Sequence, residues 1–393
     1  MQSLDGITVA DFTQLMAGGW ATQKLGDMGA DVIKVEPPRG DTQRGMSYAG
    51  QYLDGAGIGF LAMNRNKRSV ALDLKSDDGY EIARDIVASA DVLVHNFRPR
   101  VMAKFDLDYE SVREFNEDIV YTEVSAYGSD GPFADRPGQD LLFQAVTGLT
   151  SYTGRSDDPP TPAGTVVVDE HTATLAALHT LHALFHRERT GEGQKVETSL
   201  FNSAVDLQVN EVAFTTNTDQ SLERGAKTHG HPYLWPPYGL YEAADGYVAI
   251  GMAPLDEVAE ALDVDGLDGY ESQTEMFEAR DEIHDTLEAA TAAMSAEAVV
   301  DRLVEIDCQA DVVREPQEVV DHPQARHNDM IAEIEQPNGD SFTTTGIPAR
   351  HSETPGRIDR DPPELGEHSA DVLAELGYED ADIERLREDG VIE

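Results

Sequence analysis

Short apolar runs alternate with amphipathic segments over roughly the first 125 residues of the chain. The runs predict strands at residues 7–12, 31–36, 70–74, 91–97 and 119–125. A loop at 13–19 is expected to lead into a helix at 20–28, and the spacing at 79–89 predicts a second helix. Strands that alternate with helices through short connections predict an α/β fold with a parallel, doubly wound sheet. Ligands on such sheets bind beyond the carboxyl ends of the strands.

A long helix is expected from about Asp169 to a stop signal at 190–193, and residues 195–199 continue into a strand. Its apolar stripe consists of Leu175, Leu178, Leu181, Leu184 and Phe185. A strand pair at 239–251 and acidic helices to about residue 306 follow. We therefore expect a large domain over 1–225, a smaller α+β domain over 226–325, and a tail over 326–393 that returns to the large domain.

The composition is that expected of a cytoplasmic protein. Apolar residues make up 40% of the 393, and residues 1–6 lack the pattern of a secretory signal. No run approaches the roughly 18 to 20 apolar residues of a spanning helix. Cys308 is the only cysteine, which excludes an intrachain disulfide and a multi-cysteine metal site.

The charge is far from ordinary: 75 acidic residues face 29 basic ones, the net charge is −46, and only 7 of the basic residues are lysine. Such a surface repels itself in dilute salt and is tolerated where molar salt shortens the Debye length to about 3 Å. We infer a salt-loving, haloarchaeal cytoplasm. The alternative, an ordinary acidic protein, is disfavoured by the shortage of lysine. Nucleic acid and anionic membranes are poor partners for this charge.

The scarce basic residues are concentrated in one segment. Eight of them share residues 65–104 with six acids, and Arg39 and Arg44 lie just upstream. The eight are Arg65, Lys67, Arg68, Lys75, Arg84, Arg98, Arg100 and Lys104. This concentration suits a ligand with several phosphates, because Arg binds phosphate oxygens bidentately and Lys acts as a point charge. The alternative is that these residues form salt bridges with neighbouring acids.

Two further features are candidates for anion binding and catalysis. Backbone amides at Ala17-Gly18-Gly19 are able to hold an anion at a helix start, although a plain tight turn explains the glycines as well. Asp169 opens the long helix, where the dipole favours an ionised carboxylate that is available as a nucleophile. Asp169 is alternatively a capping residue, and spacing alone does not exclude its neighbour Glu170.

The histidines and the standard catalytic motifs give less evidence of function. His179, His182 and His186 share a helical face at metal-binding spacing, but no cysteine completes the set, and we expect no metal. His229 and His231 flank Gly230 in a loop that either lines a site or is structural. The sequence contains no H-E-x-x-H, G-x-S-x-G or C-x-x-C, so metalloprotease, serine-hydrolase and thiol-redox functions lack their required residues.

Several motifs nonetheless occur in a recognisable order along nearly the whole chain. They lie at residues 4–7, 11–13, 17–18, 29–36, 64, 67–69, 72–75, 96–99, 125, 127–128, 131–132, 186–194 and 363–368. In these motifs the sequence resembles the class III CoA-transferases of CaiB/BaiF type, which include formyl-CoA transferase and the carnitine CoA-transferases. The resemblance implies a large Rossmann-like domain, a small domain, and two ring-shaped chains threaded through one another as an interlocked homodimer.

The resemblance also implies roles for individual residues. It makes Asp169 the catalytic nucleophile, and it implies CoA contacts at Leu15, Met16, Ala17, Arg39, Leu72, Lys75, Asn96, Phe97, Arg98, Lys104, Arg136 and Asp140. We further expect the Gly18 amide to stabilise oxyanions. The distal carboxylate of the substrate is expected to meet Arg44, Arg65, His229 or His231. Beyond CoA as a co-substrate, we expect no cofactor and no metal.

The implied reaction moves CoA between two carboxylic acids through an aspartyl anhydride and an aspartyl-CoA thioester. Small dicarboxylates are the expected substrates, with transfer from succinyl-CoA to mesaconate, or within mesaconyl-CoA. Residues 229–238 replace the glycine-rich loop of formyl-CoA transferases, which disfavours oxalate and formate. Gln139 stands where 2-methylacyl-CoA racemases carry a histidine, which disfavours an isomerase. A non-catalytic CoA-binding protein is the second alternative.

Overall fold

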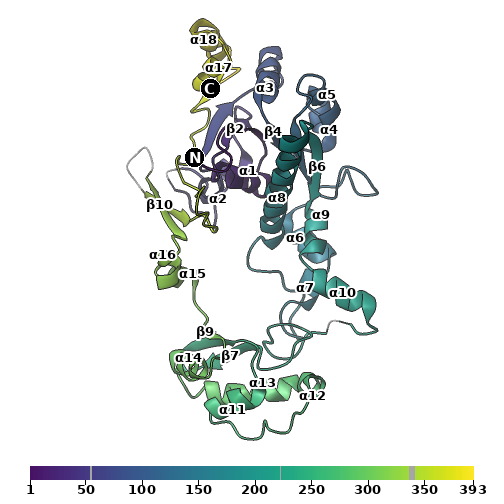
Figure 1. Cartoon of the computed structure of the whole chain (residues 1–393), viewed down its shortest axis with the longest axis vertical. Helices are drawn as coiled ribbons and strands as arrows, with labels where there is room; N and C mark the ends of the chain where they lie inside the picture. The colour runs from purple at the N-terminus through teal and green to yellow at the C-terminus, as the bar shows by residue number, and fades with distance from the viewer. Residues whose placement is uncertain (54, 222, 336–340) are drawn as a thin grey trace. The chain divides into compact units, whose positions relative to one another are not determined.

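The computed structural model describes residues 1–53, 55–221, 223–335 and 341–393 (Figure 1). The chain forms two compact units. Unit 1 comprises residues 1–143, 165–207 and 323–393, and unit 2 comprises residues 144–164 and 208–322. Each unit has its own apolar core. No helix among the described residues has the combined length and apolarity that a membrane crossing requires.

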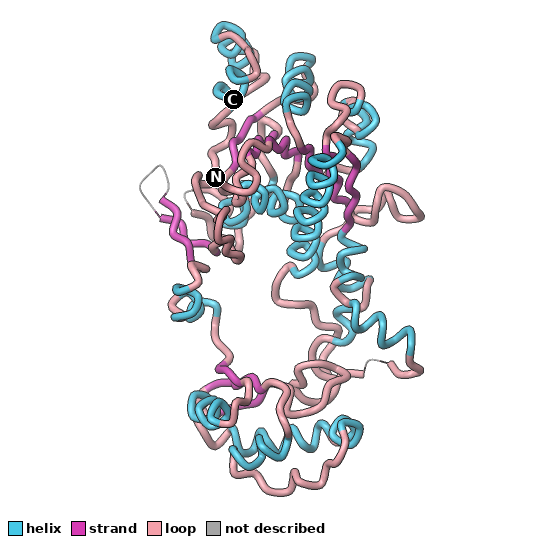
Figure 2. Tube along the Cα trace, viewed as in Figure 1, coloured by secondary structure: helices cyan, strands magenta, loops and turns pink. Residues whose placement is uncertain are grey.

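Unit 1 is built on a sheet of six strands, drawn in magenta in Figure 2. They are β1 (Thr8–Phe12), β2 (Asp31–Glu36), β3 (Lys67–Ala71), β4 (Val92–His95), β5 (Val120–Ser125) and β6 (Gln194–Ser199). Every neighbouring pair is parallel, and the order is β3-β2-β1-β4-β5-β6. The strand order reverses between β1 and β4, so the predicted doubly wound α/β sheet is confirmed.

Helices cover both faces of this sheet, and α1 and α8 share one face. The helices of unit 1 are α1 (Met16–Gly26), α2 (Ile58–Met63), α3 (Asp77–Ser89), α4 (Pro99–Met102), α5 (Tyr109–Arg113), α8 (Val167–Thr190), α9 (Leu200–Asp206), α16 (Pro323–His327), α17 (Ser369–Glu375) and α18 (Asp380–Glu388). Helices α3, α5, α17 and α18 bury apolar residues in the cluster on the opposite face. The remaining elements are the 3₁₀ helices η1 (Thr42–Gly45) and η2 (Ala103–Phe105) and the antiparallel pair β10 (Ile331–Glu335) and β11 (Ser341–Thr345).

Unit 2 is a smaller α+β unit, entered through α6 (Asp140–Val146). Its antiparallel sheet has the order β7-β8-β9, and helices pack on it around Tyr241 and Val248. Its elements are α7 (Leu149–Tyr152), α10 (Val209–Asn217), β7 (Gly239–Ala243), β8 (Gly246–Ile250), α11 (Leu255–Ala261), α12 (Gln273–Glu278), α13 (Arg280–Thr291), α14 (Ala296–Glu305), β9 (Ala310–Val312) and α15 (Pro316–Val320).

Strand β3 begins three residues earlier than its apolar pattern predicts. Lys67, Arg68 and Ser69 are polar but buried, and they pair in register with β2. The strand accommodates them because each side chain has a partner: Lys67 bonds to Asp11, Arg68 to Asp31, and Ser69 to Glu36. An apolar run is therefore not required where buried charges are paired.

Helix α1 starts at Met16, inside the segment predicted to be a loop. Its glycines and alanines are weak apolar signals, but Ala17 and Ala21 pack closely against Ala173 and Ala176 of α8. Gly18 allows a different close approach, to the loop before α1, because a Cβ there would lie 2.6 Å from Cγ2 of Thr13. Tertiary packing of small residues, rather than periodicity, extends the helix.

The apolar stripe predicted for α8 is only partly buried. The face that packs into unit 1 consists mainly of Ala and Thr, together with Leu184. Three stripe residues point to solvent instead: Leu178, Leu181 and Phe185 are 43%, 38% and 64% exposed. Both faces of α8 are therefore apolar, which is unusual for a helix that the chain itself covers on one side only.

A buried ion network lies under the end of β1. Lys67 Nζ is 3.0 Å from Asp11 Oδ2, and Lys34 Nζ is 3.0 Å from Asp41 Oδ2, with all four side chains fully buried. Burial opposes ionisation of Asp11, but the charges of Lys67 and Lys34 and the hydroxyls of Thr13 and nearby Thr22 hold its pKa below the ordinary value. Burial lowers the pKa of Lys67 to about 8, against the opposing effect of Asp11.

Replacing Asp11 by Asn should destabilise the protein by about 3 kcal/mol, because Lys67 then stays buried without its counter-charge. The measurement is the free energy of unfolding from urea titration in molar KCl. Asp135→Asn is the matched control, because its pair with Arg100 is exposed (79% for Arg100 and 72% for Asp135) and should contribute less than about 1 kcal/mol. Equal losses in the two variants would contradict a special role for the network.

Candidate active site

The carboxyl ends of β1 to β4 bring most of the predicted CoA contacts to one edge of the sheet. Leu15 and Met16 follow β1, Arg39 follows β2, Lys75 follows β3, and Asn96 to Arg98 follow β4. The Asn96 side chain joins two of these ends, because its Oδ1 accepts from Gln14 N at 2.8 Å and its Nδ2 donates to Gln14 O. This junction lies between β1 and β4, where the strand order reverses and where such sheets bind ligands.

Half of the basic cluster is already paired. Arg65 bonds bidentately to Asp27 at 2.9 and 2.7 Å, and Lys67 bonds to Asp11. Arg68 bonds to Asp31 and Glu375, and Arg100 to Asp135. For these four residues the salt-bridge alternative describes the structure.

The other cations are available to a ligand. Lys75, Arg98 and Lys104 are exposed, and the described part of the chain gives none of them an acidic partner within salt-bridge distance. Arg39 is exposed as well, and Arg84 lies over the ring of Phe115. Between the cations, Leu72 is fully buried and Phe97 packs at the margin of the core. Free positive charge therefore gathers at the carboxyl edge, although the chain as a whole carries −46.

The start of α1 faces the same edge with uncapped backbone amides. Leu15 precedes the helix at φ 61°, a left-handed conformation that is strained for a leucine, and its side chain gives no cap. Its N–H bonds to both carboxylate oxygens of Asp41 at 3.2 Å, which ties the strained residue to the buried ion network. The first-turn amides of Met16, Ala17 and Gly18 lack partners within the helix, as at any helix start.

Asp169 lies in the first turn of α8. The other end of this helix is fixed at the amino edge of the sheet, because Arg187 Nη2 bonds to Asp91 Oδ1 at 2.8 Å just before β4. The helix therefore begins at the carboxyl edge, as α1 does. Asp169 is partly buried, and burial, together with the charges of Asp140 and Glu170, raises its pKa to about 7. The sequence analysis expected the helix dipole to favour the ionised carboxylate, whereas burial and the charges of Asp140 and Glu170 act in the opposite direction.

Asp140 does not point to solvent at this edge. Its Oδ2 accepts from Val168 N at 2.8 Å and from Asp169 N at 3.0 Å, so it caps α8 from α6. The sequence analysis placed Asp140 among the CoA contacts, a role that stays a prediction. Its neighbour Arg136 is exposed, with its guanidinium 4.0 Å from the ring centroid of Phe133.

The residues expected to meet a distal carboxylate are engaged elsewhere. Arg44 bonds bidentately to Glu36 at 2.6 and 2.7 Å and lies over the ring of Phe60. In unit 2, His229 Nε2 lies 2.7 Å from Asp281 Oδ1, and His231 Nε2 lies 2.9 Å from Glu211 Oε1. Each of these groups, like Arg65, is paired with a carboxylate of the protein, and its contact with a substrate carboxylate stays a prediction.

A metal-binding arrangement occurs at one place among the described residues, in unit 2. Ligand atoms of His284, Asp285 and Glu288 lie within 4.8 Å of one another. Asp285 already pairs with Lys227, and His284 Nε2 bonds to Leu240 O at 2.9 Å. The histidines of α8 that have metal-binding spacing in the sequence do not form such a group. The rings of His179 and His182 meet edge to face, with their centroids 5.3 Å apart.

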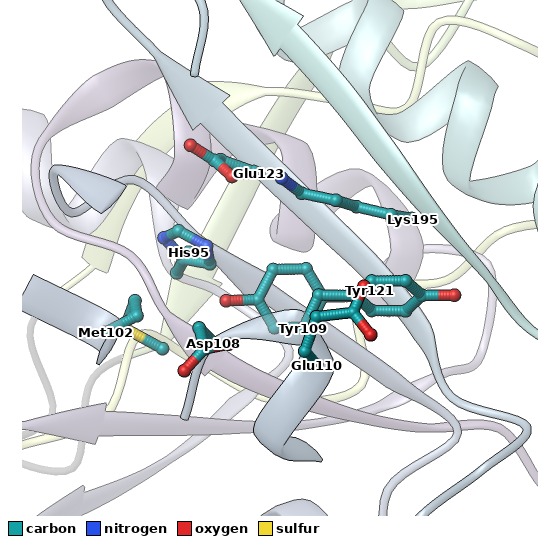
Figure 3. Close-up of a pocket in the computed structure, with 8 residues that line it drawn as sticks. All are labelled: His95, Met102, Asp108, Tyr109, Glu110, Tyr121, Glu123 and Lys195. Atoms are coloured by element: carbon teal, nitrogen blue, oxygen red, sulfur yellow. Dashed lines mark ion pairs between the residues drawn. The ribbon is translucent and has the colours of Figure 1, made fainter. Parts of the chain in front are cut away.

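A pocket of about 150 Å³ lies on the face of the sheet opposite α8 (Figure 3). It is lined by His95, Met102, Asp108, Tyr109, Glu110, Tyr121, Glu123 and Lys195. The faces are fixed by Thr122, whose hydroxyl meets that of Thr180 on α8 at 2.7 Å, so the neighbouring Tyr121 and Glu123 point the other way. The sheet therefore separates this pocket from α8.

His95 is the unusual residue of the pocket. Burial, and then the charge of Lys195, lower its pKa to about 3, so the ring is neutral. Neither ring nitrogen has a hydrogen-bond partner among the described residues, and the same holds for Glu123 Oε1. Sequence reasoning did not find this pocket, because its residues come from three strands, from helices α4 and α5 and from the residue before α5, and they carry no motif.

Comparison with known proteins decides the family. The family model described as "CoA-transferase family III" matches residues 4–369. The chain belongs to CoA-transferase family III. The resemblance inferred from the ordered motifs is thereby confirmed.

Members of family III from other organisms match over almost the whole chain. A succinyl-CoA:mesaconate CoA-transferase of Haloarcula marismortui is 35% identical over 391 residues, covering 96% of this chain and 98% of the relative. A succinate–glutarate CoA-transferase of Agrobacterium fabrum is 30% identical and covers 95% of each chain. The crystal structure of a CaiB/BaiF family protein from Brucella suis superposes with a TM-score of 0.85 at 30% identity, covering 95% of this chain and 99% of that one.

Proposed function

We propose that the protein transfers CoA from succinyl-CoA to mesaconate, or to a similar small dicarboxylate, through a covalent intermediate on Asp169. The observation that carries the proposal is the position of Asp169. A partly buried carboxylate on the first turn of α8 lies at the edge of the sheet where unpaired cations and uncapped amides gather. Haloarcula relatives named for this pair of substrates support the choice of acids.

The chemistry begins with the ionised Asp169. One carboxylate oxygen attacks the thioester carbonyl, the C–S bond breaks, and CoA thiolate leaves from a mixed anhydride of succinate and Asp169. The thiolate then attacks the aspartyl carbonyl, which releases succinate and leaves an aspartyl-CoA thioester. Mesaconate repeats the two steps in reverse, so mesaconyl-CoA leaves and the Asp169 carboxylate is restored. The covalent route divides one difficult exchange into easier steps.

The residues around the edge support these steps. Each attack creates an oxyanion, and the first-turn amides of α1, including that of Gly18, are donors of the kind that stabilise such charge. Lys75, Arg98 and Lys104 bind the phosphates of CoA, with Arg39 beside them. Asn96 keeps the ends of β1 and β4 together, so that the amides and the cations hold one ligand.

The test is to incubate the protein with succinyl-CoA and mesaconate in molar KCl and to follow acyl-CoA products and intact protein by mass spectrometry. We expect mesaconyl-CoA, and a CoA or acyl adduct that maps to Asp169. Asp169→Ala should lower turnover by at least about 10³-fold and remove the adduct while CoA binding persists. A panel of other acyl-CoA donors and acids defines the substrate range, including transfer within mesaconyl-CoA.

Further incubations separate the alternatives. A racemase would exchange the α-proton of a chiral 2-methylacyl-CoA in heavy water without any transfer. A non-catalytic CoA-binding protein would bind CoA equally well before and after the Asp169→Ala change, with no turnover in either form. An adduct on Glu170 instead of Asp169 would contradict the assignment of the nucleophile.

The exposed cations at the carboxyl edge give another prediction. Arg98→Gln or Lys104→Gln should raise the KM for acyl-CoA by about threefold to tenfold with little change in kcat, because phosphate contacts far from the thioester bind the ground state and the transition state alike. Initial rates at one fixed molar KCl concentration measure this effect. Arg314→Gln, which removes the same charge from unit 2, is the control and should leave KM unchanged.

The active form proposed here is a homodimer in a salt-rich cytoplasm. Five apolar side chains of α6 and α8 support it: Leu141, Leu142, Leu178, Leu181 and Phe185 are 38% to 64% exposed. A second copy that covers them removes apolar area from water. Sedimentation equilibrium in molar KCl should give twice the chain mass of 42.9 kDa, and a single-chain mass at working concentration would contradict the dimer.

A further inference from the structure

Helix α8 takes its cap from a distant carboxylate rather than from a local side chain. Val166 precedes the helix and gives no side-chain cap, and the nearby Thr165 hydroxyl bonds to Glu170 at 3.0 Å. The two amides of Val168 and Asp169 are instead served by one oxygen of Asp140, which is 7% exposed. A fixed anion is therefore held against the backbone of the residue that is the proposed nucleophile.

Among the described residues, no positive charge acts on Asp169 as strongly as the carboxylates of Asp140 and Glu170 do. Its burial and the charges of Asp140 and Glu170 all disfavour the anion. Across the helix interface, the charge of Lys24 on α1 acts on Glu170, and Asp206 of α9 is paired with His171.

The sheet beneath α8 presents Thr122 of β5 to the helix, through the hydroxyl contact with Thr180. Farther along the same face, below α1, the cations Lys34 and Lys67 are each paired with a buried aspartate, Asp41 and Asp11. Glu123 and Lys195 pair with each other at 3.0 Å and line the pocket on the opposite face of the sheet.

We propose that Asp140 is a positioning residue with two effects: it fixes the first turn of α8, and its charge drives Asp169 toward the acylated state. This inference rests on the proposed function of Asp169. The free carboxylate of Asp169 is an anion beside another anion, whereas the aspartyl anhydride and the aspartyl-CoA thioester are neutral. Acylation therefore removes the repulsion, and the covalent intermediate gains stability relative to the free enzyme.

The two effects are separable because a neutral oxygen can also accept the two amide hydrogen bonds. The amide oxygen of Asn and the hydroxyl of Ser are both common helix caps, and neither carries charge. Asp140→Asn and Asp140→Ser should therefore keep the helix start and lose only the repulsion. Failure of both variants to fold in molar KCl would overturn this separation.

The first readout is the pH dependence of kcat/KM, which reports ionisations of the free enzyme. Asp169 acts as an anion, so the rate should fall as pH decreases through its pKa, and the wild-type limb should lie near pH 7. Removing the charge of Asp140 makes the anion easier to form. In Asp140→Asn the limb should therefore move to lower pH by about one unit.

The second readout is the equilibrium between free and acylated enzyme, measured by intact mass with succinyl-CoA and succinate at fixed ratio and at pH 8. Acylated Asp169 is as uncharged as the protonated acid, so the two readouts are linked. A shift of about one pH unit predicts a decrease of about tenfold in the ratio of acylated to free enzyme. A role in folding alone would move neither quantity.

Asp118→Asn is the matched control, because Asp118 is an exposed aspartate of unit 1 before β5 and its removal changes the net charge by the same amount. It should leave the pH limb and the acylation ratio unchanged. An unshifted limb in Asp140→Asn, with wild type still forming the Asp169 adduct, would overturn this inference alone. Absence of the adduct in wild type would instead overturn the proposed function.

Discussion

The buried ion pairs beneath the end of β1 are the constraint on which the carboxyl edge of the sheet depends. Lys34 joins the carbonyl of Thr13 to Asp41, and Asp41 in turn accepts from the Leu15 amide. Leu15 is thereby held in a left-handed conformation that it would not adopt alone. The direction of α1, and with it the direction of its free amides, follows from this one strained residue and from the charges that hold it.

Helices α1 and α8 pack on each other and both start at the carboxyl edge of the sheet, but a side chain caps only the start of α8. The start of α1 is left without a side-chain cap, so it remains able to attract negative charge. The start of α8 is occupied by the Asp140 carboxylate, so the dipole of that helix already has its anion. Burial of Asp169, followed by the charges of Asp140 and Glu170, raises its pKa to about 7. A carboxylate with that pKa is more basic than an ordinary aspartate, and about half of it is ionised at pH 7.

Because the surface is so acidic, a positive charge that stays unpaired is an informative feature of this protein. With 29 basic residues against 75 acids, most cations are expected to be neutralised locally. The structure divides the cluster between residues 65 and 104 by depth. Arg65, Lys67 and Arg68 are buried in ion pairs that fix the sheet, whereas Lys75, Arg98 and Lys104 remain exposed and unpaired within the described residues. Molar salt screens the surface repulsion far more than it screens the buried pairs.

The sequence by itself predicted the sheet, because apolar runs at 7–12, 31–36, 91–97 and 119–125 that alternate with helical segments are typical of buried parallel strands joined by helices. It also determined the family, because ordered motifs along the whole chain are specific. The sequence pattern misplaced the starts of two elements whose buried residues are polar or small. Strand β3 begins at Lys67 because its buried polar side chains have distant partners, and helix α1 begins at Met16 because its small residues pack on another helix.

Only the tertiary structure decided which described cations are paired and how the surroundings of Asp169 shift its pKa. Sequence spacing could not decide between salt bridges and ligand contacts for each residue of the basic cluster, because the acids that pair with it lie up to 307 residues away, as Glu375 does from Arg68. Asp140 is 28 residues from the amide it caps at Val168, so its effect on Asp169 has no local signature in the sequence. Electrostatic energies depend on distance and burial in space, and both are set by the fold.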